Sequence, residues 1–184
     1  MKAIVFAAAL LAAPLTHAAE FTSVVPEKSS IAFVTKQMGV AVDGSFKRFK
    51  ASLAFDPAAP QTAAAQFDID TASIDAGGAE ANDEAKGKNW FAVQQYPTAS
   101  FKATSVKALG PNKFEVRGPL TIRGKSKEVV APVSFKQDGA NGVFDGALTI
   151  KRLEFGLGQG MWADTETVGD DVQIKFHIVA APKK

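Results

Sequence analysis

The sequence contains no cysteine in its 184 residues. Such a chain can form no disulfide and no thiolate metal site, and it carries no thiol nucleophile. Histidine is nearly as scarce, with His17 close to the N-terminus and His177 on a predicted strand near the C-terminus. One imidazole without thiolates makes a zinc site improbable, and histidine is the commonest base beside a hydroxyl nucleophile, so we predict no metal-binding and no catalytic residue. We expect His177 to face solvent.

A concentration of charge of one sign is also missing. The 21 Lys and Arg residues nearly balance the 19 Asp and Glu residues, and both kinds are scattered along the chain. Nucleic acid is therefore not an expected partner, because its phosphates need a basic patch. The segment around Gly124 resembles the end of a phosphate-binding loop, but Pro119 stands where that motif needs its first glycine, so no nucleotide cofactor is predicted.

Long hydrophobic runs are absent except at the N-terminus. The run from Ala3 to Ala13 has about 11 residues, short of the roughly 20 that span a bilayer. A lysine precedes it and small residues follow it, which is typical of a secretory signal peptide. We predict that residues 1–18 are removed after Ala18, with Ala19 as the alternative site. The mature domain is then 19–184, periplasmic and without an integral membrane span.

The segment from Phe114 to Phe135 predicts a β-hairpin with one apolar face. Apolar residues fall on even numbers in its first arm and on odd numbers in its second, a period of two that indicates half-buried strands. Two registers place both apolar rows on one side. A two-residue turn at Gly124-Lys125 pairs Leu120 with Val129, and a four-residue loop pairs Ile122 with Val129.

Similar strand patterns recur along the chain, separated by Gly, Pro, Asn and Asp. Gly118 and Pro119 interrupt one of these strands and predict a bend, a bulge or an edge position. The predicted fold is all-β, an antiparallel sandwich or barrel with a short helix from Ala79 to Phe91 in the long 71–97 connection. Asn82 or Asp83 is the predicted N-cap of this helix. The eight predicted strands are approximately Ser29–Gln37, Val40–Phe55, Thr62–Asp70, Thr98–Ala108, Asn112–Arg123, Ser126–Lys136, Gly142–Arg152 and Asp171–Ala180.

Large aromatic residues gather in two irregular segments. Trp90 and Phe91 follow the predicted helix, where they either anchor it to the sheet or line a ligand entrance. Met161 and Trp162 lie in the glycine-rich segment 155–169, where large apolar groups need a cover, either the core or a ligand.

Four blocks of sequence, in this order and spacing, resemble the YceI family of exported polyisoprenoid-binding proteins. They are Ser29–Asp56, Lys88–Val106, Gly118–Phe135, and Lys151–Gly158 together with Val168–Val172. The resemblance implies an extended, lipocalin-like, eight-stranded antiparallel β-barrel that holds a long isoprenoid or quinone-type lipid. Fourteen Phe against one Tyr fits an apolar lumen that avoids buried hydroxyl groups.

A carrier or sequestering protein, and not an enzyme, is the function that the resemblance implies. The expected partner is a long-chain apolar molecule, and the only expected cofactor is a bound polyisoprenoid or quinone-like lipid. A homodimer is possible, and the sequence does not decide the oligomeric state. A ligand-free structural or stress-response barrel, and an enzyme acting on a lipid-like substrate, are the alternatives. Arg152 is a candidate contact for a polar headgroup, although a structural partnership with a carboxylate is favoured. The predicted ligand-binding residues are Phe46, Phe49, Trp90, Phe91, Leu120, Arg152, Phe155, Met161 and Trp162.

Overall fold

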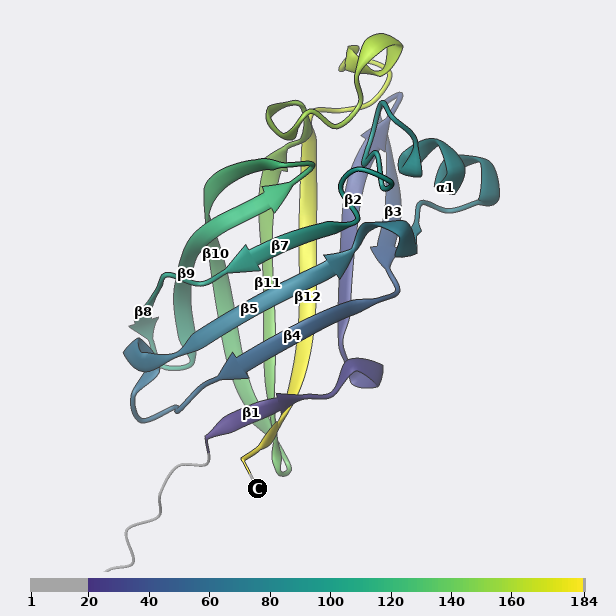
Figure 1. Ribbon diagram of the computed structural model, residues 1–184. Coiled ribbons are helices and arrows are strands. Elements are labelled where there is room, and N and C mark those ends of the chain that lie inside the picture. Colours follow the sequence, from purple (N-terminus) through teal and green to yellow (C-terminus); the bar gives the residue numbers. More distant parts are fainter. Residues whose placement is uncertain (1–19, 184) are drawn as a thin grey trace, which may run out of the picture.

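The computed structural model describes residues 20–183 as one curled antiparallel sheet with a single α-helix beside one of its ends (Figure 1). The predicted signal peptide and its cleavage site lie outside the described residues. The strands are β1 (Phe21–Val24), β2 (Ser30–Gln37), β3 (Val40–Phe46), β4 (Phe49–Ala54), β5 (Ala64–Asp70), β6 (Ile74–Asp75), β7 (Thr98–Lys102), β8 (Ser105–Gly110), β9 (Lys113–Ile122), β10 (Lys125–Asp138), β11 (Asn141–Lys151) and β12 (Asp171–Pro182). The helices are α1 (Ala79–Lys86) and the 3₁₀ turns η1 (Pro26–Lys28), η2 (Pro60–Thr62), η3 (Thr71–Ser73), η4 (Arg152–Phe155) and η5 (Gly160–Ala163).

The predicted eight-stranded antiparallel barrel is confirmed. The structure has more strands than predicted, partly because a bend divides each of two predicted strands in two. The predicted strand Val40–Phe55 becomes β3 and β4, and Thr98–Ala108 becomes β7 and β8. The strand order is β4-β5-β7-β9-β10-β11-β12-β2-β3-β6, with every pair antiparallel. The path closes because β3 continues into β4 through the bend at Lys47-Arg48.

The short strands β1 and β6 were not predicted from the sequence. β6 pairs with β3. β1 pairs with β12 and lies across the end of the barrel near β4 (Figure 1). The backbone groups of Phe21 and Phe55 exchange two hydrogen bonds, of 2.8 and 3.0 Å, and these join β1 to the end of β4. Phe21 is almost fully buried, and its ring packs against Phe135 with the centroids 5.5 Å apart, so β1 covers the aromatic cluster at this end of the barrel.

The hairpin of β9 and β10 corrects both predicted registers. Lys125 pairs with Ile122 across a two-residue turn at Arg123-Gly124, so Leu120 lies opposite Lys127. Both turn residues have positive φ, 48° and 70°, which is the type I′ geometry that matches strand twist. The actual register also pairs odd with even numbers, so the predicted apolar face is correct although the pairs are not.

Gly118 marks a bend where β9 changes its neighbour from β7 to β8. After the bend, Thr121 and Leu120 of β9 pair with Ser100 and Phe101 of β7. Before the bend, Arg117 of β9 pairs with Ser105 of β8. A Cβ atom at Gly118 would lie 2.0 Å from the backbone oxygen of Lys102, so only glycine allows this approach. The predicted bend is confirmed, and it permits the strong curvature of the barrel.

Helix α1 is shorter than predicted and is capped differently. It ends at Lys86, because Gly87 follows and the chain then passes through turns to Tyr96. Asn82 or Asp83 was expected as the N-cap, but the N-cap is Gly78, without a side-chain bond. Asn82 instead accepts a hydrogen bond of 2.6 Å from the Ala76 backbone, which ties the helix to β6.

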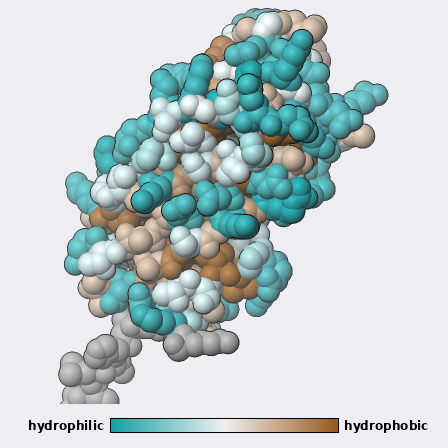
Figure 2. Space-filling model, in the orientation of Figure 1, coloured by the Kyte–Doolittle hydropathy of each residue, from teal (hydrophilic) through white to brown (hydrophobic). Residues whose placement is uncertain are grey.

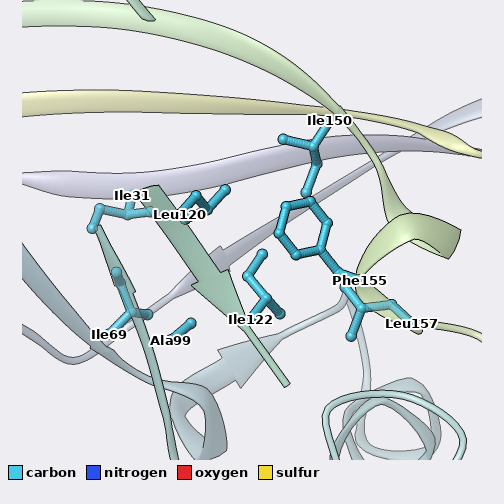
Figure 3. Packing of buried hydrophobic residues seen from close by; sticks show 8 residues of the cluster. All are labelled: Ile31, Ile69, Ala99, Leu120, Ile122, Ile150, Phe155 and Leu157. Carbon is cyan, nitrogen blue, oxygen red and sulfur yellow. The ribbon is translucent and has the colours of Figure 1, made fainter. Parts of the chain in front are cut away.

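Two apolar clusters fill the barrel at different heights. One is a group of aromatic rings near β1, with Phe55 in contact with Phe114, Phe135 and Phe144 at centroid distances of 5.0 to 5.4 Å. The other lies nearer α1, and Figure 3 shows the Phe155 ring of η4 between Ile150 and Ile122. Figure 2 shows mainly hydrophilic and intermediate side chains on the outside, with hydrophobic residues in small patches. Within residues 20–183, no helix has the length and apolar character to cross a membrane.

Candidate functional site

The barrel interior holds two cavities that follow one another along its length. The narrow cavity has a volume of about 180 Å³, and the wide cavity has a volume of about 540 Å³. Ile122 and Ile174 line both, so the two spaces adjoin. Exposed residues Gln37, Glu80 and Glu84 border the wide cavity, so the lumen approaches the surface beside α1.

The narrow cavity is entirely apolar. Every residue that lines it is Ala, Val, Leu, Ile or Phe. They come from all around the barrel, and the alternation along each strand places them inside: Leu120 and Ile122 on β9, for example, face the lumen while Thr121 faces outward. The aromatic rings of Phe55, Phe114 and Phe144 border this end. The cavity can therefore hold a hydrocarbon chain and offers no hydrogen bond to one.

The wide cavity has one aromatic wall made by two segments far apart in sequence. Trp90 and Trp162 lie with ring centroids 6.0 Å apart, and both line the cavity. Phe91 lines it too and meets the Phe46 ring edge-on at 5.6 Å. The aromatic residues after α1 thus anchor the segment 87–97 and also line the cavity. The two alternatives predicted for them, an anchor and a lining, therefore occur together.

Arg152 is the buried centre of this end of the barrel. Its side chain is 1% exposed, and its five N–H groups all donate to backbone carbonyls. The acceptors are the oxygens of Gly169 at 3.0 Å, Leu157 at 2.9 Å, Gly158 at 3.3 Å, Trp162 at 2.8 Å and Val168 at 2.7 Å. The guanidinium also lies 5.3 Å from the centroid of the Trp90 ring.

This arrangement corrects the prediction for Arg152. Neither a headgroup nor a carboxylate receives its hydrogen bonds, because the carbonyls of the 157–169 segment use every donor. Burial lowers the pKa of Arg152 from its usual value, and nearby Asp170 partly opposes that effect. A Cβ atom at Gly158, whose φ is 76°, would lie 2.0 Å from Nη1 of Arg152, so the glycine lets the carbonyls converge. Arg152 shapes the segment that carries Trp162.

Further hydrogen bonds hold the two aromatic segments together. The backbone oxygen of Asn89 accepts from Gly158 and Gln159, each at 2.8 Å. Arg123 donates to the backbone oxygens of Lys88 and Gly156 and so bridges both segments from the hairpin turn. These bonds offset the cost of a positive φ at Arg123, a non-glycine residue. The sequence analysis missed this role, because it depends on contacts more than 30 positions apart.

The structure places the predicted site residues in four groups: the lining of each cavity, the surrounding core and the surface. Leu120 lines the narrow cavity, and Trp90, Phe91, Arg152 and Trp162 line the wide one. Phe46, Phe49 and Phe155 pack in the surrounding core and line neither cavity. Met161 is 80% exposed and is corrected from a lining residue to a surface residue, because η5 directs Trp162 inward in its place.

His177 lies on the outer face of β12, as predicted. It is opposite Asp145 of β11, and its Nδ1 is 2.6 Å from the carboxylate. It lines neither cavity. Among residues 20–183, no three His, Cys, Asp or Glu side chains are placed to hold a metal ion together.

A closed antiparallel barrel around an apolar lumen, with polar residues at one end, defines the class of lipocalin-like barrels. The model of the YceI-like domain matches residues 23–180, and the chain belongs to this family. A UPF0312 protein of Azotobacter vinelandii is 29% identical over 167 residues, which cover 85% of this chain and 86% of that protein.

Two solved structures show the same fold. The crystal structure of Burkholderia cenocepacia BcnA has a TM-score of 0.85 at 46% identity, covering 86% of this chain and all of that chain (100%). A polyisoprenoid binding domain from Saccharophagus degradans, implicated in plant cell wall breakdown, has a TM-score of 0.71 at 17% identity. It covers 89% of this chain and 99% of that chain.

Proposed function

We propose that this protein is an exported carrier or sequestering protein that binds one long-chain isoprenoid or similar lipid inside its barrel. The observation that carries the proposal is the pair of adjoining cavities, of which the narrow one is lined by apolar residues alone. A hydrocarbon tail fits the narrow space, and the wide space near α1 takes the bulkier end. The Saccharophagus degradans domain supports the proposal only as a barrel of the same fold that is described as binding polyisoprenoids.

Binding is a better account of the site than catalysis. Glu80 and Glu84 border the wide cavity, one helical turn apart on α1, but both are exposed. No His or Cys accompanies them among the described lining residues, and His177 lies outside the barrel. The lining therefore lacks the close nucleophile-and-base pair that covalent catalysis uses, whereas its apolar surface suits the binding of a hydrocarbon chain.

Affinity is expected to rise with the length of the ligand chain and then to level off once the lumen is filled. Each buried methylene contributes about 0.8 kcal/mol, roughly a fourfold change in Kd. A series of prenyl alcohols, titrated into delipidated protein and followed by the fluorescence of Trp90 and Trp162, measures this. Mass spectrometry of an organic extract from natively purified protein identifies the resident ligand.

A plug in the narrow cavity tests the position of the tail. Ala131 lines that cavity, whereas its neighbour Val130 is on the outside. In Ala131→Phe the gain in affinity from longer chains should disappear, and Val130→Phe should bind like the natural protein. If the natural protein itself bound chains of every length equally and its native extract contained no lipid, the ligand-free barrel would be favoured.

Export to the periplasm rests on the N-terminal sequence alone and is part of the proposal. Protein recovered from the periplasmic fraction of cells that express the full chain is expected to begin at Ala19 or at the following residue. N-terminal sequencing checks this. Recovery of the chain with Met1 intact, in the cytoplasmic fraction, would contradict export.

A further inference from the structure

Exposed apolar side chains gather at the end of the barrel where the wide cavity reaches the surface. Five large apolar residues are exposed among residues 20–183, and three of them, Met38, Val40 and Met161, belong to this end. Met38 and Val40 form the tip of the β2–β3 hairpin and are 74% and 66% exposed, and Met161 lies in η5. The hairpin tip and the segment that contains η5 meet at the top of Figure 1. We call these three residues the apolar rim.

Backbone hydrogen bonds join the two segments of the apolar rim. The N–H of Met38 donates to the oxygen of Thr167 at 2.9 Å, and the N–H of Gly169 donates to the oxygen of Lys36 at 2.8 Å. The Arg152 guanidinium holds the segment 157–169 from the inside. The rim is therefore one braced surface and not two independent loops.

The apolar rim is continuous with the lining of the wide cavity. Val40 pairs with Gln37, and residues that pair across antiparallel strands point to the same face of the sheet. Gln37 lines the wide cavity, and so does Val42, two residues further along β3. Val40 therefore extends the inner face of the hairpin beyond the cavity wall. Met161 directly precedes Trp162, which lines the cavity from the other side chain segment.

The size and the charges of the rim indicate which kind of surface covers it. A stable interface between two proteins buries about 800 Å² of each partner, more than three side chains supply. A lipid bilayer needs no such area, because it accepts apolar side chains one by one. Strongly anionic bilayers attract clusters of Lys and Arg, whereas here the exposed Lys36 is accompanied by the exposed carboxylates of Asp164 and Glu166. Charges of both signs complement zwitterionic headgroups, which carry a phosphate and an ammonium group.

We infer that the apolar rim docks on a zwitterionic lipid bilayer and sets the opening of the wide cavity against the headgroup layer. The three side chains enter the bilayer interface, where their apolar surface leaves water. A lipid chain then passes between the bilayer and the lumen along apolar surface. β1 and the end of β12 lie at the opposite end of the barrel, so neither obstructs the rim (Figure 1). This inference rests on the proposed function, because a protein that carries a water-insoluble chain must exchange it with a membrane.

Flotation of the mature protein with phosphatidylcholine vesicles measures the docking. The double variant Val40→Asp/Met161→Asp should lower the partition onto vesicles at least about tenfold, because it replaces two apolar side chains with charged ones. Both sites are exposed, so its melting temperature should stay close to that of the natural protein. Leu109→Asp is the matched control, since Leu109 is also exposed but lies on β8, away from the rim (Figure 1). It should partition within about twofold of the natural protein.

Three results of the flotation would overturn the inference. The first is equal partition of the double variant and the natural protein, and the second is an equal loss in Leu109→Asp. The third is a dimer of the natural protein that the double variant loses, without vesicle binding, which would assign the rim to a second copy of the chain. Replacing a third of the lipid with phosphatidylglycerol should change the partition of the natural protein by less than about twofold. A larger rise that salt abolishes would show that charge drives the contact, and it would overturn the inference as well.

Exchange of a ligand separates docking from binding inside the barrel. Geranylgeraniol is offered to delipidated protein either in phosphatidylcholine vesicles or from cyclodextrin. The double variant should take it up from vesicles at least about tenfold more slowly, in proportion to its lower partition, and from cyclodextrin at the natural rate. Equal rates of uptake from vesicles would overturn the inference and leave the carrier function intact. Failure of the natural protein to take up geranylgeraniol from cyclodextrin would instead overturn the carrier function, while flotation would still decide the docking.

Discussion

Leu120→Asp is expected to unfold the barrel, whereas Thr121→Asp should be tolerated. Leu120 is 7% exposed, packs in the cluster near α1 and lines the narrow cavity, where no cation is available to a carboxylate. Burying an unpaired carboxylate costs several kcal/mol, on the order of the whole stability of a small domain. Thr121 lies one residue away with its hydroxyl bonded to Ser126 on the outer face, and a change there costs about 0.5 kcal/mol.

Both variants introduce an aspartate into the same strand, β9, and they differ in the face of the strand on which its carboxylate lies. Urea or thermal unfolding, followed by far-ultraviolet circular dichroism, measures both. Equal midpoints for the two variants would show that the alternation of faces along β9 is assigned incorrectly.

Arg152→Met is expected to lose on the order of 3–5 kcal/mol of unfolding free energy. The variant keeps much of the side-chain volume but removes the donor from five carbonyls, of which the three on Leu157, Gly158 and Val168 accept buried hydrogen bonds. Each unsatisfied buried group costs about 1–3 kcal/mol, and the two partly buried carbonyls add less. Because those carbonyls belong to the 157–169 segment, we expect that segment to loosen first and to carry Trp162 away from Trp90. Ligand affinity should fall together with stability.

Lys151→Met is the matched control for Arg152→Met. Lys151 is the preceding residue, and its half-exposed ammonium forms an ion pair of 2.7 Å with Asp171. That hydrogen bond and the nearby negative charge raise the pKa of Lys151. An exposed pair contributes little to stability, so the control should melt close to the natural protein. Hydrogen exchange across residues 153–170 checks the local effect, and normal protection in Arg152→Met would refute the proposed role of the guanidinium.

The strands and their inner faces were predictable from the sequence because side chains alternate along a strand. In β12 the apolar residues Val172, Ile174, Phe176 and Ile178 fall on even numbers, and all four line the lumen. The bend at Gly118-Pro119 was predictable for an equally local reason, since proline and glycine restrict or permit particular backbone geometries. The aromatic character of the entrance at Trp90 and Trp162 could likewise be read from the segments that contain them.

The register of the β9–β10 hairpin could not be determined from alternation. Every register that pairs odd with even numbers satisfies the same pattern. In the observed turn at Arg123-Gly124, the Arg123 side chain donates to the distant carbonyls of Lys88 and Gly156, contacts that alternation along a strand does not reveal. The pairing of Phe21 with Phe55 could not be predicted either, because it joins segments that are distant in the sequence. The strand that contains Phe21 is only four residues long, and its partner Phe55 lies 34 positions away.

The sequence by itself determined the strand faces, the apolar lumen and the residue types at its entrance, because these follow from the side-chain period and from local backbone geometry. Only the tertiary structure decided that the Arg152 guanidinium donates to five backbone carbonyls, that Met161 faces solvent, and that Trp90 and Trp162 meet in the wall of one cavity. Each of these facts depends on which groups from distant segments meet. Hydrogen-bond donors and acceptors have no pattern along the chain that shows whether a partner will be within reach.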